Sequence, residues 1–152
     1  MVTSMPSTLS QKATKIMEDQ KGSCSQAVFA TYGEHLSSGG VDFETGMKIA
    51  SAFSGGIART GSMCGALTGA LMALGLKFND AEKYNQINVV AVKLLDEFES
   101  INESTICRQL INHDLLTEED LKQAFKTGAF DNCTKYVEDV TKILDKLIAS
   151  DL

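Results

Sequence analysis

The stretch that decides the fold is MCGALTGALMAL, which runs from Met63 to Leu74. It carries no charged residue on any side, whereas a helix at a protein surface keeps one polar face. The stretch therefore predicts a central helix over 63–74 that the rest of the chain surrounds. Gly61, Gly65 and Gly69 fall four residues apart, just before and within this helix. Such a stripe indicates either close packing against another backbone or room for a cofactor beside Cys64.

Outward from this stretch, apolar residues recur at three- and four-residue spacing, which is the periodicity of α-helices. Pro6 is the only proline, so no proline interrupts the chain after it. Capping residues and glycines predict the helix boundaries: a helix over 9–28 split at Gly22, one from Asp42 to Gly55-Gly56, the central helix opened by Ser62 and closed by Gly75, one opened by Asn79 or Asp80, a short one over 106–111, one from Thr117 to Gly128, and a last one capped by Asp131. We expect an all-α bundle of about six to seven helices, forming a single domain over 1–152 with residues 1–7 as a disordered leader.

The overall charge excludes several classes of partner. Fourteen basic and twenty acidic residues leave a net charge of −6, which argues against nucleic acids and anionic membrane surfaces. The first ten residues show no secretory signal, and the longest uncharged stretch, over 60–76, is too short and too rich in glycine to span a bilayer. We therefore expect a cytoplasmic protein, where thiols are more typical of metal binding or redox chemistry than of structural disulfides.

The chain has four cysteines, and none forms a Cys-x-x-Cys pair: Cys24, Cys64, Cys107 and Cys133. Each follows a residue that suits a helix N-cap (Ser23, Ser62, Thr105 and Asp131) by one or two positions. All four are therefore predicted in the first turn of a helix, where unpaired N–H groups and the helix dipole favour thiolate over thiol. Four converging N-termini would supply about +2 of partial charge, which balances the −2 of a metal centre with four thiolates. A free cysteine is also often only a small buried apolar residue.

Two blocks of the sequence resemble a known family. They are GSCSQAV over 22–28 and GGIARTGSMCGALTGA over 55–70, and the single cysteines Cys107 and Cys133 complete the pattern. They resemble the redox-active family named for its pattern C_GCAxxG_C_C, over 9–147. This chain has the order Cys-Gly-Ala where the family name writes Gly-Cys-Ala. The resemblance implies a small helical redox protein, and a distant likeness to the iron–sulfur part of split-Soret cytochromes implies a cluster, without the haem motifs of those proteins.

Other candidate residues are fewer. Arg59, the one charge in the glycine-rich loop, either neutralises a thiolate site or is an exposed loop arginine. Gly65 is a candidate to contact the cofactor. His35 and His113 are the only histidines, and no HxxxH or HExxH pattern is present, which disfavours a histidine metal site.

Three functions follow from these residues. In the first, the four cysteines ligate one metal centre, an iron–sulfur cluster, for electron transfer or sensing with an unknown redox partner protein. In the second, the cysteines form two pairs for thiol–disulfide exchange, with Cys64 as a nucleophile of low pKa. In the third, they hold a structural zinc in a non-catalytic protein. The glycine-rich helix could also serve a homodimer interface.

Overall fold

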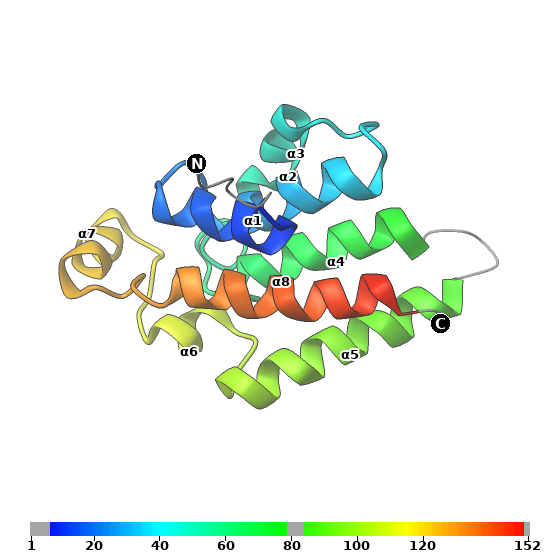
Figure 1. Ribbon diagram of the computed structural model, residues 1–152. Coiled ribbons are helices and arrows are strands. Elements are labelled where there is room, and N and C mark those ends of the chain that lie inside the picture. Colours follow the sequence, from blue (N-terminus) through cyan, green and yellow to red (C-terminus); the bar gives the residue numbers. More distant parts are fainter. Residues whose placement is uncertain (1–6, 79–83, 151–152) are drawn as a thin grey trace, which may run out of the picture.

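The computed structural model describes residues 7–78 and 84–150, and this part of the chain contains eight α-helices, one short 3-10 helix and no strand (Figure 1). The elements are α1 (Leu9–Glu18), α2 (Cys24–Leu36), α3 (Phe43–Ala50), η1 (Ser51–Phe53), α4 (Gly65–Phe78), α5 (Tyr84–Asn102), α6 (Cys107–Ile111), α7 (Glu118–Thr127) and α8 (Cys133–Ala149). The all-α prediction is confirmed, with one or two more helices than expected. No described helix combines the length and the apolarity that crossing a membrane requires.

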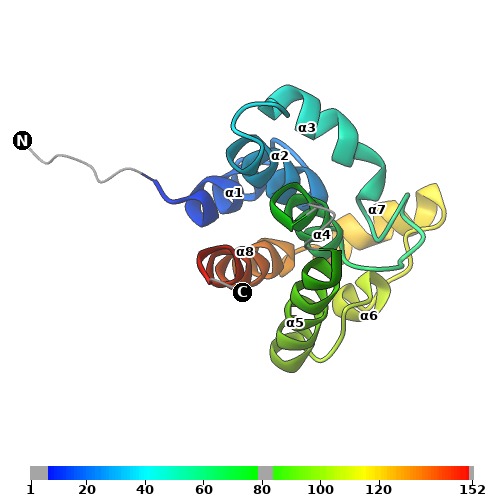
Figure 2. The same ribbon diagram turned by 90° about the vertical axis from the view of Figure 1, so that its right-hand side faces the viewer.

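The central helix is α4, as the uncharged stretch predicts. It packs against α2, α5 and α8, and Figure 2 shows it enclosed by them. Its bounds differ from the prediction at both ends. Met63 forms an isolated antiparallel bridge with Ile106, so the helix begins only at Gly65. A side chain at Gly75 would meet nothing within 4 Å, and the helix continues through this position to Phe78.

The glycine stripe on α4 brings the backbone of α2 close. A Cβ atom at Gly69 would lie 2.8 Å from the carbonyl oxygen of Ser25 and 3.2 Å from Cβ of Val28. Real Cβ atoms essentially never approach another atom to within 3.0 Å. Only glycine at this position therefore permits the observed distance between α2 and α4.

Several helix starts follow the predicted capping chemistry. Thr117 and Asp120 form a capping box, and the Asp42 carboxylate accepts from the Thr45 N–H at 2.7 Å. The last helix is different: α8 begins at Cys133 after Asn132, whose side chain makes no capping bond, so the prediction that Asp131 caps it is wrong. The predicted start at residues 79–80 lies outside the described residues, as does the expected leader except for Ser7.

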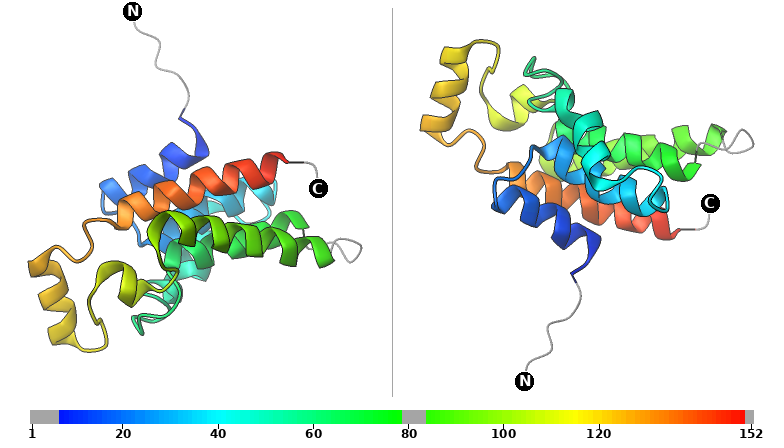
Figure 3. Two further views of the ribbon diagram at one scale, coloured as in Figure 1. Left: turned by 90° about the horizontal axis from the view of Figure 1, so that it is seen from below. Right: turned by 90° about the horizontal axis from the view of Figure 1, so that it is seen from above.

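The apolar core is divided into two clusters. The larger one joins α1, α2, α3, α4, α5 and α8. The smaller one contains Cys107, Ile111, Leu115 and Ala124 and belongs to residues 107–132, which comprise α6, α7 and the loops after them. We call this segment the cap. Figure 3 shows it at one end of the bundle, and α6 and α7 make few contacts with the other helices.

Candidate functional site

The four cysteines line one small cavity where the cap meets the bundle. The cavity has a volume of about 20 Å³, and its other lining residues are Gly65, Leu110, Ile111 and Tyr136. Cys64 belongs to the large cluster and Cys107 to the small one, with Cys24 and Cys133 packed against the large and the small cluster respectively. Residues up to 109 positions apart in the sequence (133 − 24) thus share one site.

A short backbone ladder fixes Cys64 beside Cys107. The Cys64 N–H donates to the Thr105 carbonyl at 2.9 Å, and the Cys107 N–H donates to the Ser62 carbonyl at 2.6 Å. These bonds flank the Met63–Ile106 bridge. Backbone hydrogen bonds therefore hold the loop before α4 and the start of α6 in register, independently of their side chains.

Two glycines make room for cysteine side chains. A Cβ atom at Gly65 would lie 2.5 Å from the Cys24 sulfur, and one at Gly56 would lie 2.6 Å from Cβ of Cys107. Gly56 also has a left-handed backbone, with φ of 69°. The glycine of the Cys-Gly-Ala motif thus leaves space for the side chain of Cys24 on the facing helix. The second glycine of the Gly-Gly pair leaves space for the side chain of Cys107 on the cap.

The loop before α4 contains a left-handed turn that the sequence analysis did not predict. Residues 55 to 59 all have positive φ, including the non-glycine residues Ile57, Ala58 and Arg59 at 65°, 51° and 61°. Each non-glycine residue in this region costs about 1–2 kcal/mol. Hydrogen bonds hold the turn: the Ala58 N–H donates to the Ala52 carbonyl at 2.7 Å and the Arg59 N–H to the Ser54 carbonyl at 3.1 Å. Gly55-Gly56 was the only signal of it, because the other three residues rarely adopt this backbone.

Three of the four cysteines lie in the first turn of a helix, as predicted, and the fourth lies just before one. Cys24, Cys107 and Cys133 are the first residues of α2, α6 and α8, and Cys64 directly precedes α4. Backbone N–H groups reach the sulfurs: those of Ser25 and Ala66 lower the pKa of Cys24, and those of Ala66 and Leu67 lower the pKa of Cys64. The Cys24 sulfur therefore faces the N-termini of two helices at once.

Burial raises the pKa of each cysteine by more than these N–H groups lower it. The expectation that the thiolates are favoured is therefore wrong. Burial raises the pKa of Cys107 to about 11 and that of Cys133 to about 12, helped by repulsion from the Cys24 thiolate. Burial also raises the pKa of Cys24, and it raises the pKa of Cys64 well above its ordinary value, with repulsion from Cys24 adding to it. Cys64 is thus not a thiol of low pKa, because removing a charge from water costs more than the nearby N–H groups return.

Of the other candidate residues, Gly65 lines the cavity, whereas Arg59 and the two histidines do not. Arg59 is exposed, and its side chain lies over Gly55 rather than lining the cavity. His113 is outside the lining, with its Nδ1 atom 2.6 Å from the Asp114 carbonyl oxygen. His35 lines a separate groove between α1 and α2. An effect of Arg59 on a bound cofactor stays a prediction.

Tyr136 is a lining residue that the sequence analysis missed. It lies one turn after Cys133 on α8, and its hydroxyl donates to the carbonyl of Leu110, one turn after Cys107 on α6, at 3.0 Å. The bond therefore braces one cysteine-bearing helix against another. The sequence could not predict this contact, because Leu110 lies 26 positions before Tyr136.

The geometry of the thiols bears on which metal they could hold. Within residues 7–78 and 84–150, no three His, Cys, Asp or Glu side chains are arranged to hold a metal ion. A single tetrahedral ion with bonds near 2.3 Å would keep its sulfurs about 3.8 Å apart. The four thiols share a cavity without forming a preformed single-ion site.

The comparisons with known proteins give one match. The model of the family described as "Putative redox-active protein (C_GCAxxG_C_C)" matches residues 23–147. No curated protein and no solved structure matches the chain. The matched region contains all four cysteines and both glycine-rich segments of the site. The chain belongs to the C_GCAxxG_C_C family of redox-active proteins.

Proposed function

We propose that the four cysteines bind one iron–sulfur cluster, which the protein uses for electron transfer or sensing with a protein partner. The observation that carries this proposal is that Cys24, Cys64, Cys107 and Cys133, the only cysteines of the chain, line one cavity from four helix N-termini. Four thiolates are the ligand set that [2Fe–2S] and [4Fe–4S] clusters require. A bound cluster would supply one-electron chemistry at a potential set by its surroundings.

A cluster and a single zinc ion would use the same four thiolates, and the described thiols are not preformed around a single ion. The cavity of about 20 Å³ is smaller than a cluster, so loading requires the thiols to turn or the cap to move outward. The cap suits such a movement, since α6 and α7 make few contacts with the bundle.

Groups around the cysteines fit a site of net negative charge. Backbone N–H groups of Gly65 and Ala66 lower the pKa of Cys24, and those of Ala66 and Leu67 lower that of Cys64, against the larger effect of burial. Hydrogen bonds to ligating sulfurs raise a cluster's reduction potential and stabilise its charge. Apolar residues around the cavity, such as Leu110 and Ile111, keep water from it.

Thiol–disulfide exchange is the second candidate, because the same cavity brings four thiols together. The raised pKa values of all four thiols weigh against it, since the thiolate is the attacking species. This candidate predicts that the protein contains little metal and that oxidation joins the cysteines in two pairs.

The test is metal analysis of protein purified without oxygen. We expect absorption between about 300 and 450 nm together with iron and acid-labile sulfide. Each single Cys→Ser variant should lose most of the iron, because no other lining residue can replace a thiolate. Val92→Ser, on the exposed face of α5, is the matched control and should keep it.

The outcomes separate the three functions. Zinc without sulfide would favour the structural metal site. Protein without iron or zinc whose thiols oxidise in pairs would favour thiol–disulfide exchange. Iron retained in two or more of the Cys→Ser variants would contradict a site built from all four cysteines.

A further inference from the structure

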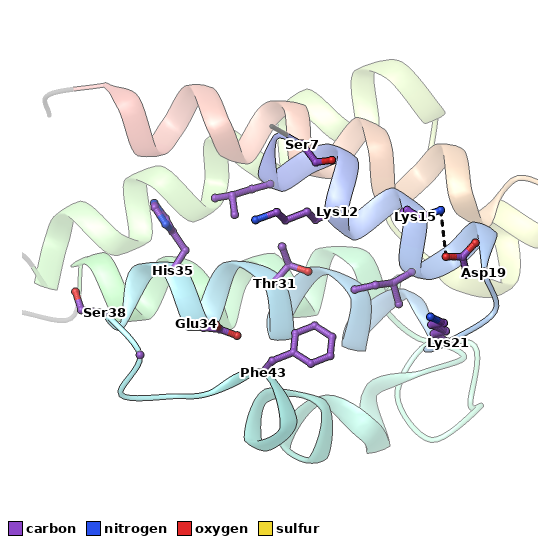
Figure 4. A pocket seen from close by; sticks show the side chains of 13 residues that line it. Ser7, Lys12, Lys15, Asp19, Lys21, Thr31, Glu34, His35, Ser38 and Phe43 are labelled. Atoms are coloured by element: carbon purple, nitrogen blue, oxygen red, sulfur yellow. Dashed lines mark ion pairs between the residues drawn. The ribbon is translucent and has the colours of Figure 1, made fainter. Parts of the chain in front are cut away.

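A second, larger hollow lies on the flank of the bundle, between α1, α2 and the start of α3 (Figure 4). This groove has a volume of about 640 Å³ and shares no lining residue with the cysteine cavity. Sites for small molecules in proteins usually measure about 300–1,000 Å³ and combine apolar walls with a few polar groups. The size of the groove is therefore that of a small-molecule site.

The charges around the groove favour an anion. Lys12, Lys15 and Lys21 line it together with Asp19 and Glu34, a balance of 3 − 2 = +1 in a chain whose net charge is −6. Lys15 is paired with Asp19 at 3.3 Å, as Figure 4 shows. Lys12 and Lys21 have no ion-pair partner among the described residues. Two ammonium groups and only one carboxylate, that of Glu34, are thus without an ion-pair partner in the described part of the chain, which leaves a net positive charge in the groove to meet an anionic ligand.

A buried hydroxyl on the groove wall lacks a partner. Thr31 is only 7% exposed, and its oxygen makes no hydrogen bond. The other buried threonines, Thr68 and Thr141, bond to the carbonyls of Gly65 and Val137 in their own helices, at 3.0 and 2.9 Å. A threonine on a helix has two accessible χ1 rotamers, so a turn about this bond can direct the hydroxyl into the groove. An acceptor atom there would relieve the cost of an unsatisfied polar group.

Apolar side chains complete the wall. Phe43, at the start of α3, is 41% exposed, and its ring lies at the groove opposite Lys12 (Figure 4). Leu9 and Ile16 line the groove from α1. A small inorganic anion would leave these apolar surfaces in contact with water, whereas an anion with an apolar body would cover them.

We propose that this groove binds a small organic anion. Its acidic group, a carboxylate, phosphate or sulfonate, is held by Lys12 and by the hydroxyl of Thr31, and its apolar body lies against Phe43 and Leu9. The inference is independent of the cysteine site, since it uses none of its residues.

The test uses anilinonaphthalene sulfonate, an aromatic anion whose fluorescence rises on binding, measured by titration and by amide chemical shifts. We expect one binding site, with shifts concentrated in α1 and α2. Lys12→Met and Thr31→Val should each weaken binding about tenfold, the effect of losing one charge-assisted hydrogen bond. Thr31→Ser keeps the hydroxyl and should bind the probe as tightly as the parent. Lys122→Met, which removes an exposed lysine from α7, should also leave the affinity unchanged.

Thermal unfolding keeps the result interpretable. Thr31→Val should keep or raise the Tm, because it removes an unpaired buried hydroxyl while preserving shape, so weaker binding cannot be ascribed to unfolding. Equal affinity of the parent and both variants for the probe would overturn the proposal. So would equally tight binding of the neutral N-phenylnaphthylamine, or complete competition by inorganic phosphate at equal concentration, because the proposal requires charge and an apolar body together.

Discussion

Gly65 and Gly69 are one turn apart on α4, but a side chain at each position would meet a different obstacle. At Gly65 the nearest atom is the Cys24 sulfur at 2.5 Å, the end of a side chain that can rotate, and backbone atoms of Phe53 and Ser25 follow at 3.1 and 3.2 Å. At Gly69 the nearest atom is the Ser25 carbonyl oxygen at 2.8 Å, which belongs to the backbone of α2. We expect Gly65→Ala to turn Cys24 out of the cavity and lose bound metal. Gly69→Ala should instead push α2 from α4, lowering the free energy of unfolding by about 1–3 kcal/mol while the folded protein keeps its metal.

Gly75→Ala is the control for this pair. It lies in the same helix, but a Cβ atom there would meet nothing within 4 Å, so the change should stabilise the protein by about 0.5–1 kcal/mol through the unfolded chain. Urea unfolding and iron content of the three variants would be measured side by side. Equal metal loss in Gly65→Ala and Gly75→Ala would show that contact with Cys24 is not what Gly65 provides.

At the scale of the elements, the cap is the part whose position depends most on the site. Bonds from the Cys107 and Arg108 N–H groups to the Ser62 and Gly61 carbonyls tie it to the loop before α4. The shared cavity and the bond from Tyr136 to the Leu110 carbonyl tie it to the other helices. Tyr136→Phe leaves this carbonyl without its donor, a cost of about 0.5–1.5 kcal/mol. We expect amide hydrogen exchange in α6 to become about threefold to tenfold faster, and removal of bound metal to speed it further.

The matched variant is Tyr32→Phe. It deletes the bond from Tyr32 to the Asp145 carboxylate, 2.6 Å long, within the bundle. In this variant, amide hydrogen exchange should become faster around α2 and α8 and stay unchanged in α6. If both variants affected α6 alike, the cap would respond to overall stability and not to its brace.

The elements also show which features the sequence could predict. Boundaries set by local chemistry were predictable, because a capping residue such as Thr117 or a left-handed Gly128 acts on its own helix end. The start of α4 was not, because Met63 pairs with Ile106, 43 residues further on (106 − 63). The place of each cysteine at a helix start was predictable from the capping residue before it, whereas their meeting in one cavity was expected only from the hypothesis of a shared metal centre. Their protonation was not predictable, since it depends on burial that appears only when the cap closes over the bundle.

For the whole molecule, the buried thiols make stability depend on pH in one direction. Their folded-state pKa values lie above the unfolded value of about 8.5, reaching about 11 for Cys107 and about 12 for Cys133. In reduced protein without metal, this contribution to stability is therefore complete below about pH 8.5 and is lost as the pH rises toward the folded-state values. Each thiol that ionises only in the unfolded chain lowers the free energy of unfolding by about 1.4 kcal/mol per pH unit.

The measurement is urea unfolding under reductant at several pH values between about 7.5 and 10.5, a window set by these pKa values. We expect a level free energy of unfolding up to about pH 8.5 and a steep fall above it. The double variant Cys107→Ser, Cys133→Ser should reduce the slope, because serine does not ionise in this range. Bound metal should remove the fall, since ligated thiolates have already released their protons. A level profile in the metal-free parent would mean that water reaches the thiols and that the cap does not close over them, because burial is the largest cause that separates their folded and unfolded pKa values.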